Sequence, residues 1–151
     1  DRILRRAPSI PALEPSSMVN AMRPVECIAF MLMQDDQVLA EKRKHTKRVV
    51  PGTVALPGGH IEPRESPEEA LYRELQEEVG IIPTQIAYAC TLLHRSQEFR
   101  KLHYFAVTRW DGEIISHEAE SLLWIPLNAL EILDLDVDKI AVHEYLRVYT
   151  P

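Results

Sequence analysis

The chain has 151 residues, the length of a single domain that can bury its own core. Hydrophobic residues make up 46% and charged residues 26%, which excludes a disordered chain, and the longest apolar stretch, residues 27–33, is too short to span a bilayer. The net charge of −6 argues against a dedicated DNA- or RNA-binding protein.

Residues 1–21 contain three prolines and no periodic apolar pattern, so we expect a tail that is disordered or was introduced by cloning. We assign one domain to residues 22–151. In it we expect strands over residues 25–33, 38–40, 53–56, 86–94, 102–110 and 122–125, helices over 67–79 and 138–148, and a short helical turn from 126. Asp35-Asp36 predicts the turn of a hairpin between the first two strands. This order of elements indicates an α/β domain with a mixed sheet.

The helix at 67–79 has clear signals at both ends. Ser66 suits the N-cap, Pro67 suits the first helical position, and Glu69 completes an S-x-x-E capping box. Gly80 suits the position after the helix, where the backbone needs a positive φ.

Winding this helix at ~100° per residue separates two faces. The apolar face, expected to pack on the sheet, carries Leu71, Tyr72, Leu75 and Val79. The other face carries Arg73, Glu74, Glu77 and Glu78. Glu74 and Glu78 form a like-charge i,i+4 pair that destabilises a helix by ~0.2–0.5 kcal/mol. A solvated acidic face would tolerate this cost, whereas a hard dication such as Mg²⁺ would remove it by taking carboxylate oxygens as ligands.

The sequence around this helix concentrates charge. Residues 59–81 hold seven acids and two bases, which leaves −5 of the total of −6. A basic run lies upstream and consists of Lys42, Arg43, Lys44, Lys47 and Arg48. Gly58-Gly59 lies between them and permits close approach of the backbone to a ligand. An acidic block beside a basic run indicates that a metal and an anionic ligand meet there.

The residues that carry this pattern have the spacing of a known signature. Gly59, then Glu65, then Arg73-Glu74-Leu75-Gln76-Glu77-Glu78-Val79-Gly80-Ile81 match every specified position of the Nudix box. The chain therefore resembles the Nudix (MutT-like) hydrolase family. Leu56-Pro57-Gly58-Gly59 before the box and Trp124-Ile125-Pro126-Leu127 after it also look like the family.

The resemblance implies an α/β/α sandwich in which a loop-helix-loop binds Mg²⁺ or Mn²⁺. It also implies hydrolysis of a nucleoside diphosphate linked to another group. Carried over by position, Glu74, Glu77 and Glu78 are metal ligands, Gly59 gives a backbone carbonyl, Arg73 orients a glutamate and Glu65 supports the loop. Homodimers are common in the family, while neither a membrane nor a nucleic acid polymer is expected as a partner.

The remaining site residues are selected by chemistry. A base must accept a proton from the attacking water, and among Glu74, Glu118 and Glu120 we select Glu120 from outside the box. For phosphate contacts we select Lys42, Arg43 and Lys47, with a solvated loop as the alternative. For stacking on a base we select Tyr104 and Phe105, with core packing as the alternative.

We favour a (deoxy)nucleoside triphosphate as substrate, including oxidised forms such as 8-oxo-dGTP. The proline and tyrosine that mark the ADP-ribose and dinucleoside polyphosphate enzymes after the box are missing from residues 96–99. The alternatives are a pyrophosphatase for ADP-ribose or another dinucleotide, a non-catalytic nucleotide sensor, and a Nudix-fold isopentenyl diphosphate isomerase. The isomerase needs a cysteine near its pocket.

The two cysteines, Cys27 and Cys90, stand far apart in the sequence. They indicate neither a zinc site nor a disulfide framework. We expect both to be small buried strand residues, which argues against the isomerase and fits a cytoplasmic protein.

Overall fold

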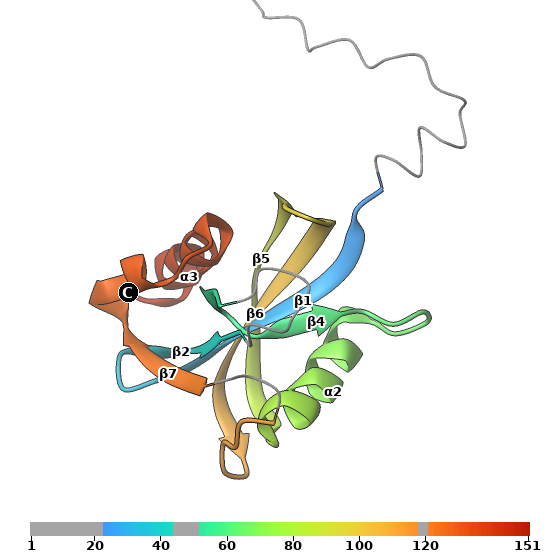
Figure 1. Ribbon diagram of the computed structural model, residues 1–151. Coiled ribbons are helices and arrows are strands. Elements are labelled where there is room, and N and C mark those ends of the chain that lie inside the picture. Colours follow the sequence, from blue (N-terminus) through green and yellow to red (C-terminus); the bar gives the residue numbers. More distant parts are fainter. Residues whose placement is uncertain (1–22, 44–51, 118–120) are drawn as a thin grey trace, which may run out of the picture.

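The computed structural model describes residues 23–43, 52–117 and 121–151, and within these ranges a mixed sheet of seven strands lies between two helices (Figure 1). The strands are β1 (Val25–Gln34), β2 (Gln37–Lys42), β3 (Val54–Ala55), β4 (Gly58–His60), β5 (Ile82–Arg95), β6 (Phe99–Asp111) and β7 (Ser121–Pro126). The helices are α2 (Pro67–Val79), the 3₁₀ segment η1 (Leu127–Ile132) and α3 (Asp136–Tyr149). This arrangement confirms the expected α/β architecture.

The sheet runs in the order β3-β2-β1-β6-β5, with β4 paired to β1 and β7 paired to β2. β1 and β6 are parallel, and the other pairs are antiparallel. β1 and β2 form the predicted hairpin. Its two turn residues, Asp35 and Asp36, have φ angles of 52° and 58°, as a two-residue type I′ turn requires.

The core has two layers because successive side chains of β1 point to opposite faces of the sheet. Ile28 and Phe30 belong to the layer under α2, together with Leu71 and Leu75 of that helix. Cys27, Ala29 and Met31 belong to the layer under α3, which also contains Ala141 and Val142. A strand covered on both faces reads as a continuous apolar run, which is the pattern of residues 27–33.

The buried face of α2 differs from the predicted apolar face. Tyr72 was expected to pack on the sheet, but 46% of it is exposed, so this prediction was wrong. Glu74 and Glu78 are instead buried beside Leu71 and Leu75. The buried face is rotated toward the acidic residues because Ala70 is small enough to let that side of the helix approach the sheet. Two carboxylates are thereby held inside the protein.

Several boundaries also differ from the predicted ones. The glycine pair Gly58-Gly59 lies in β4, where Gly59 is paired with Ile28 of β1. A Cβ at Gly58 would overlap the carbonyl oxygen of Ile28, so this close pairing requires glycine there. β5 and β6 extend beyond their apolar centres, and α3 begins two residues early. No helix among the described residues has the length and apolar character needed to cross a bilayer.

Candidate active site

Both ends of α2 are fixed as predicted. The Ser66 hydroxyl accepts a hydrogen bond from the Glu69 amide at 3.1 Å, and the Glu69 carboxylate accepts one from the Ser66 amide at 2.9 Å. Gly80 ends the helix with φ 73°. The capping box fixes the first turn of the helix, and the left-handed glycine fixes its last turn. Together they set where the acidic residues of the helix lie relative to the loop before it.

Arg73 connects that loop to the helix. Its Nε and Nη2 donate to the two oxygens of Glu65 at 2.7 and 2.8 Å, which is a bidentate pair. Its Nη1 donates to Glu74 at 2.8 Å and to Glu77 at 3.2 Å, and Nη2 also donates to the carbonyl of His60 at 2.9 Å. Arg73 thus orients two of the predicted metal ligands, where the sequence predicted one.

The charges of this network shift the protonation of its members. Hydrogen bonds from Arg73 lower the pKa of Glu65 to about 2 from its ordinary 4.5. The hydrogen bonds that Arg73 donates to Glu65 are likewise the main cause of a raised pKa of Arg73. The pair is therefore fully ionised at neutral pH, and Glu65 supports the loop by holding Arg73 in place.

The three predicted metal ligands have different environments. Glu74 and Glu78 are buried, with 9% and 5% exposed, whereas 52% of the Glu77 side chain is exposed. A Cβ at Gly59 would overlap the Glu74 carboxylate, so glycine lets this carboxylate lie against the backbone of β4. Arg73 contacts both Glu74 and Glu77, and the three carboxylates do not form one tight ligand group.

These residues fit a hard divalent cation. All of the donors are oxygens, from carboxylates and from the backbone at Gly59, and such donors are the ones that Mg²⁺ and Mn²⁺ prefer. Two carboxylates are held in a buried position where a charge without compensation is costly. A cation at this face of α2 would offset that cost, and Arg73 offsets part of it already.

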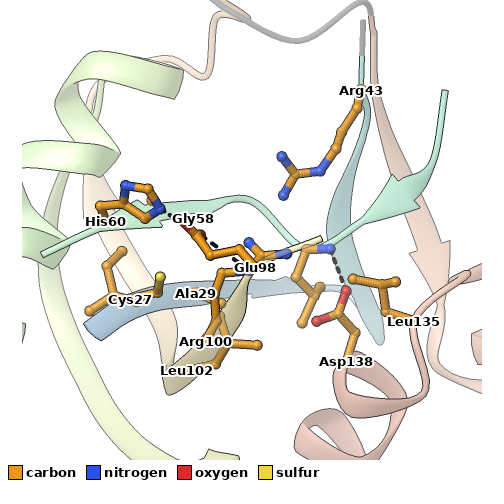
Figure 2. Close-up of a pocket in the computed structure, with 13 residues that line it drawn as sticks. Cys27, Ala29, Arg43, Gly58, His60, Glu98, Arg100, Leu102, Leu135 and Asp138 are labelled. Atoms are coloured by element: carbon orange, nitrogen blue, oxygen red, sulfur yellow. Dashed lines mark hydrogen bonds and ion pairs between the residues drawn. The ribbon is translucent and has the colours of Figure 1, made fainter. Parts of the chain in front are cut away.

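A pocket of about 300 Å³ opens next to this face (Figure 2). Gly58 and Gly59 form part of its wall, so the pocket and the acidic residues share the same strand. The polar side chains that line it are Arg43, His60, Glu98, Arg100 and Asp138. Arg43 and Arg100 bring guanidinium groups to this wall, each near a carboxylate: Arg43 Nη2 lies 4.0 Å from Glu41, and Arg100 Nε lies 3.9 Å from Glu98.

Asp138 lies at the end of the pocket away from α2 (Figure 2). Its Oδ2 accepts a hydrogen bond from the Leu56 amide at 3.0 Å, and its Oδ1 accepts one from the Tyr104 hydroxyl at 2.7 Å. Burial raises the pKa of Asp138 to about 6. This carboxyl group can therefore present either protonation state near neutral pH.

The selected substrate contacts lie in different places. Arg43 lines the pocket, while Lys42 is half-buried at the end of β2. Tyr104 and Phe105 lie in the core, with 0% and 3% exposed, so neither ring lines the pocket. Each face of their strand is covered by a layer that contains a helix. Both rings therefore pack in the core, which was the alternative to stacking on a base. Lys47, Glu118 and Glu120 lie outside the described residues.

Sequence reasoning missed the other side chains of the pocket, namely Cys27, Glu98, Arg100 and Asp138. Cys27 is buried on a strand as predicted, but it also lines the pocket, and burial raises its pKa to about 12. Asp138 could have been noticed, because it is an acid within an apolar helical pattern. Glu98 and Arg100 gave no signal, since their position depends on the β5–β6 hairpin.

The ion pair of Glu65 predicts a specific pH dependence of stability. Because the folded pKa of about 2 lies below 4.5, the pair stabilises the protein above pH 4.5, and this stability is lost as the pH falls from about 4.5 toward 2. We expect Glu65→Gln to lower the melting temperature at pH 7 and to lower it progressively less in that acidic range. Thermal unfolding of both proteins across the range measures this; a difference independent of pH would contradict it.

Comparison with known proteins agrees with this geometry. Residues 22–146 match the family model described as NUDIX domain. The CTP pyrophosphohydrolase of Escherichia coli K12 is 30% identical over 134 residues, which cover 86% of this chain and 98% of that protein. The 8-oxo-dGTP diphosphatase of the same strain is 30% identical over 117 residues, covering 75% and 88%. A MutT NUDIX hydrolase from Burkholderia pseudomallei superposes with a TM-score of 0.72 at 25% identity, covering 81% of this chain and 98% of that one.

Proposed function

Because the chain belongs to the Nudix family and is a pyrophosphohydrolase, we propose that its substrate is a (deoxy)nucleoside triphosphate. It would convert this substrate, with Mg²⁺ or Mn²⁺, into the nucleoside monophosphate and pyrophosphate. Oxidised nucleotides of the 8-oxo-dGTP type are included in the proposal. The names of two relatives, the CTP pyrophosphohydrolase and the 8-oxo-dGTP diphosphatase, each give a triphosphate as the substrate, which supports the choice.

One observation carries the proposal: the pocket and the acidic face of α2 share a wall. Gly58 and Gly59 line the pocket, and Gly59 also lies against the Glu74 carboxylate. A base seated in the pocket would therefore direct its phosphates toward α2. The volume of about 300 Å³ lies at the small end for ligand pockets, which suits one base better than the two nucleosides of a dinucleotide.

The polar groups of the pocket support a nucleotide base as the ligand. Arg43 and Arg100 offer donors, and Asp138 offers a carboxyl group. Hydrogen-bond donors and acceptors at fixed positions distinguish the edges of the bases. The apolar part of the wall includes Leu56 and Leu102, which can contact the faces of a ring.

The chain's own residues would perform the reaction as follows. Glu74, Glu77 and Glu78, with the Gly59 carbonyl, would hold the dication. The bound cation would supply neutralisation of phosphate charge and a lowered pKa of the attacking water. Arg73 keeps Glu74 and Glu77 in position, and Glu65 keeps Arg73 in position. We retain Glu120 as the proposed base.

One substrate panel tests this proposal. NTPs, dNTPs, 8-oxo-dGTP, ADP-ribose, NADH, dinucleoside polyphosphates and CoA are each incubated with Mg²⁺ and with Mn²⁺, and the products are separated by ion-exchange chromatography. We expect the highest kcat/KM for a triphosphate, with monophosphate and pyrophosphate as products. A higher value for ADP-ribose or a dinucleotide would overturn the substrate, and binding of nucleotides without turnover would indicate a sensor.

A further inference from the structure

A second group of possible metal ligands lies in the wall of the pocket, on other elements than the carboxylates of α2. Cys27 belongs to β1 and His60 to β4, and Glu98 is the residue immediately before β6. Among the residues that the structure describes, this is the group of three whose ligand atoms all lie within 4.8 Å of one another. Figure 2 shows the three side chains gathered at one end of the pocket, opposite Asp138.

Two members of the group are positioned by the sheet, and Glu98 lies in the turn between β5 and β6. Cys27 and His60 are direct partners in the β1–β4 pairing, and Cys27 is also paired with Leu102 of β6. The His60 Nε2 lies 2.9 Å from the Glu98 carboxylate, so one ring nitrogen already faces the group. Cys27 is 1% exposed, yet it borders the pocket beside these polar groups.

The kinds of donor identify the class of metal. A thiol, an imidazole and a carboxylate together are ligands of Zn²⁺ and of other transition-metal dications, which bind sulfur well. Mg²⁺ requires oxygen ligands and does not suit this group. The donors on α2 are oxygens only, so the two sites would select different ions.

We propose that Cys27, His60 and Glu98 bind a Zn²⁺ ion inside the pocket, at a site separate from the one formed by Glu74, Glu77 and Glu78. Three protein ligands leave the fourth position of a tetrahedral ion open, and here it would face the pocket. The open position can take water or a donor atom of a bound nucleotide. Bonds to the ion would replace the hydrogen bond between His60 and Glu98, and the thiol proton of Cys27 would be released to solvent.

Cobalt spectroscopy of the full chain tests the site without any activity measurement. Co²⁺ is added to the wild-type protein, and we expect a near-ultraviolet thiolate-to-cobalt charge-transfer band that saturates at one equivalent. The band is expected to disappear in Cys27→Ser and to persist in Cys90→Ser, which removes the other cysteine. Absence of the band in the wild type, or its persistence in Cys27→Ser, would overturn the proposal.

Zinc affinity, measured by competition with a chromophoric chelator, separates this site from α2. We expect His60→Gln and Glu98→Gln each to weaken Zn²⁺ binding roughly tenfold or more. Both side chains are partly exposed, so these variants keep the test valid even if Cys27→Ser does not fold. Glu77→Gln is expected to leave the Zn²⁺ affinity unchanged. Loss of affinity in Glu77→Gln alone would assign the ion to α2 and refute the site.

Discussion

Replacing Glu78 by glutamine is expected to reduce metal-dependent turnover about a thousandfold or more while the protein remains folded. Glutamine keeps the shape of the side chain but removes the charge that would bind the dication. A dication bound there would stabilise the transition state by several kcal/mol, and each 1.4 kcal/mol corresponds to a factor of ten in rate. Glutamine also keeps the volume of this buried side chain, so we expect the packing around it to be retained.

The companion variant is Glu77→Gln, for which we also expect turnover to be abolished although this side chain is largely exposed. Release of pyrophosphate at saturating Mg²⁺ measures the loss, and thermal unfolding verifies the fold. Glu68→Gln is a matched control, since Glu68 is an exposed acid in the first turn of the same helix. Full activity in either Glu77→Gln or Glu78→Gln would refute the metal assignment.

The second large effect is expected at Arg73. In Arg73→Ala the carboxylates of Glu65, Glu74 and Glu77 lose the cation that holds them together. Removing one member of a partly buried ionic network costs about 3 kcal/mol of stability. We also expect kcat to fall roughly a hundredfold, as for groups that orient metal ligands. Chemical denaturation and steady-state kinetics measure the two effects.

Two further variants make the Arg73 result specific. Arg73→Lys keeps the charge but cannot form the bidentate pair with Glu65, so its loss of stability and activity should be intermediate. Arg147→Ala removes an arginine from an exposed pair with Glu144 and should change little. If Arg73→Ala behaved like Arg147→Ala, Arg73 would be an ordinary surface residue.

The parts of the fold that follow from local sequence were predictable. The ends of α2 are set by Ser66, Glu69 and Gly80, whose effects act within a few residues, and the predicted bounds are those observed. The strand at 25–33 was recognisable because both of its faces are buried. The rotation of α2 was not recognisable, since it depends on how closely Ala70 approaches the sheet and not on the pattern of the helix alone.

The candidate site divides in the same way. The acidic residues of α2 have helical spacing, so their common face could be predicted from the sequence. The wall of the pocket could not, because Cys27, His60 and Glu98 meet only through the pairing of β1 with β4 and β6. The prediction that Tyr104 and Phe105 stack on a base failed because β6 is covered on both faces. Alternation along the strand places one ring in each buried layer.

The most direct measurement of the central claim is a crystal structure with Mn²⁺ and a non-hydrolysable triphosphate analogue. Manganese gives an anomalous signal that locates the ion independently of the protein. We expect a peak between the phosphates and the carboxylates of Glu74, Glu77 and Glu78, near the Gly59 carbonyl, with the base in the pocket beside Arg43. A bound nucleotide with no peak at these carboxylates would contradict the account.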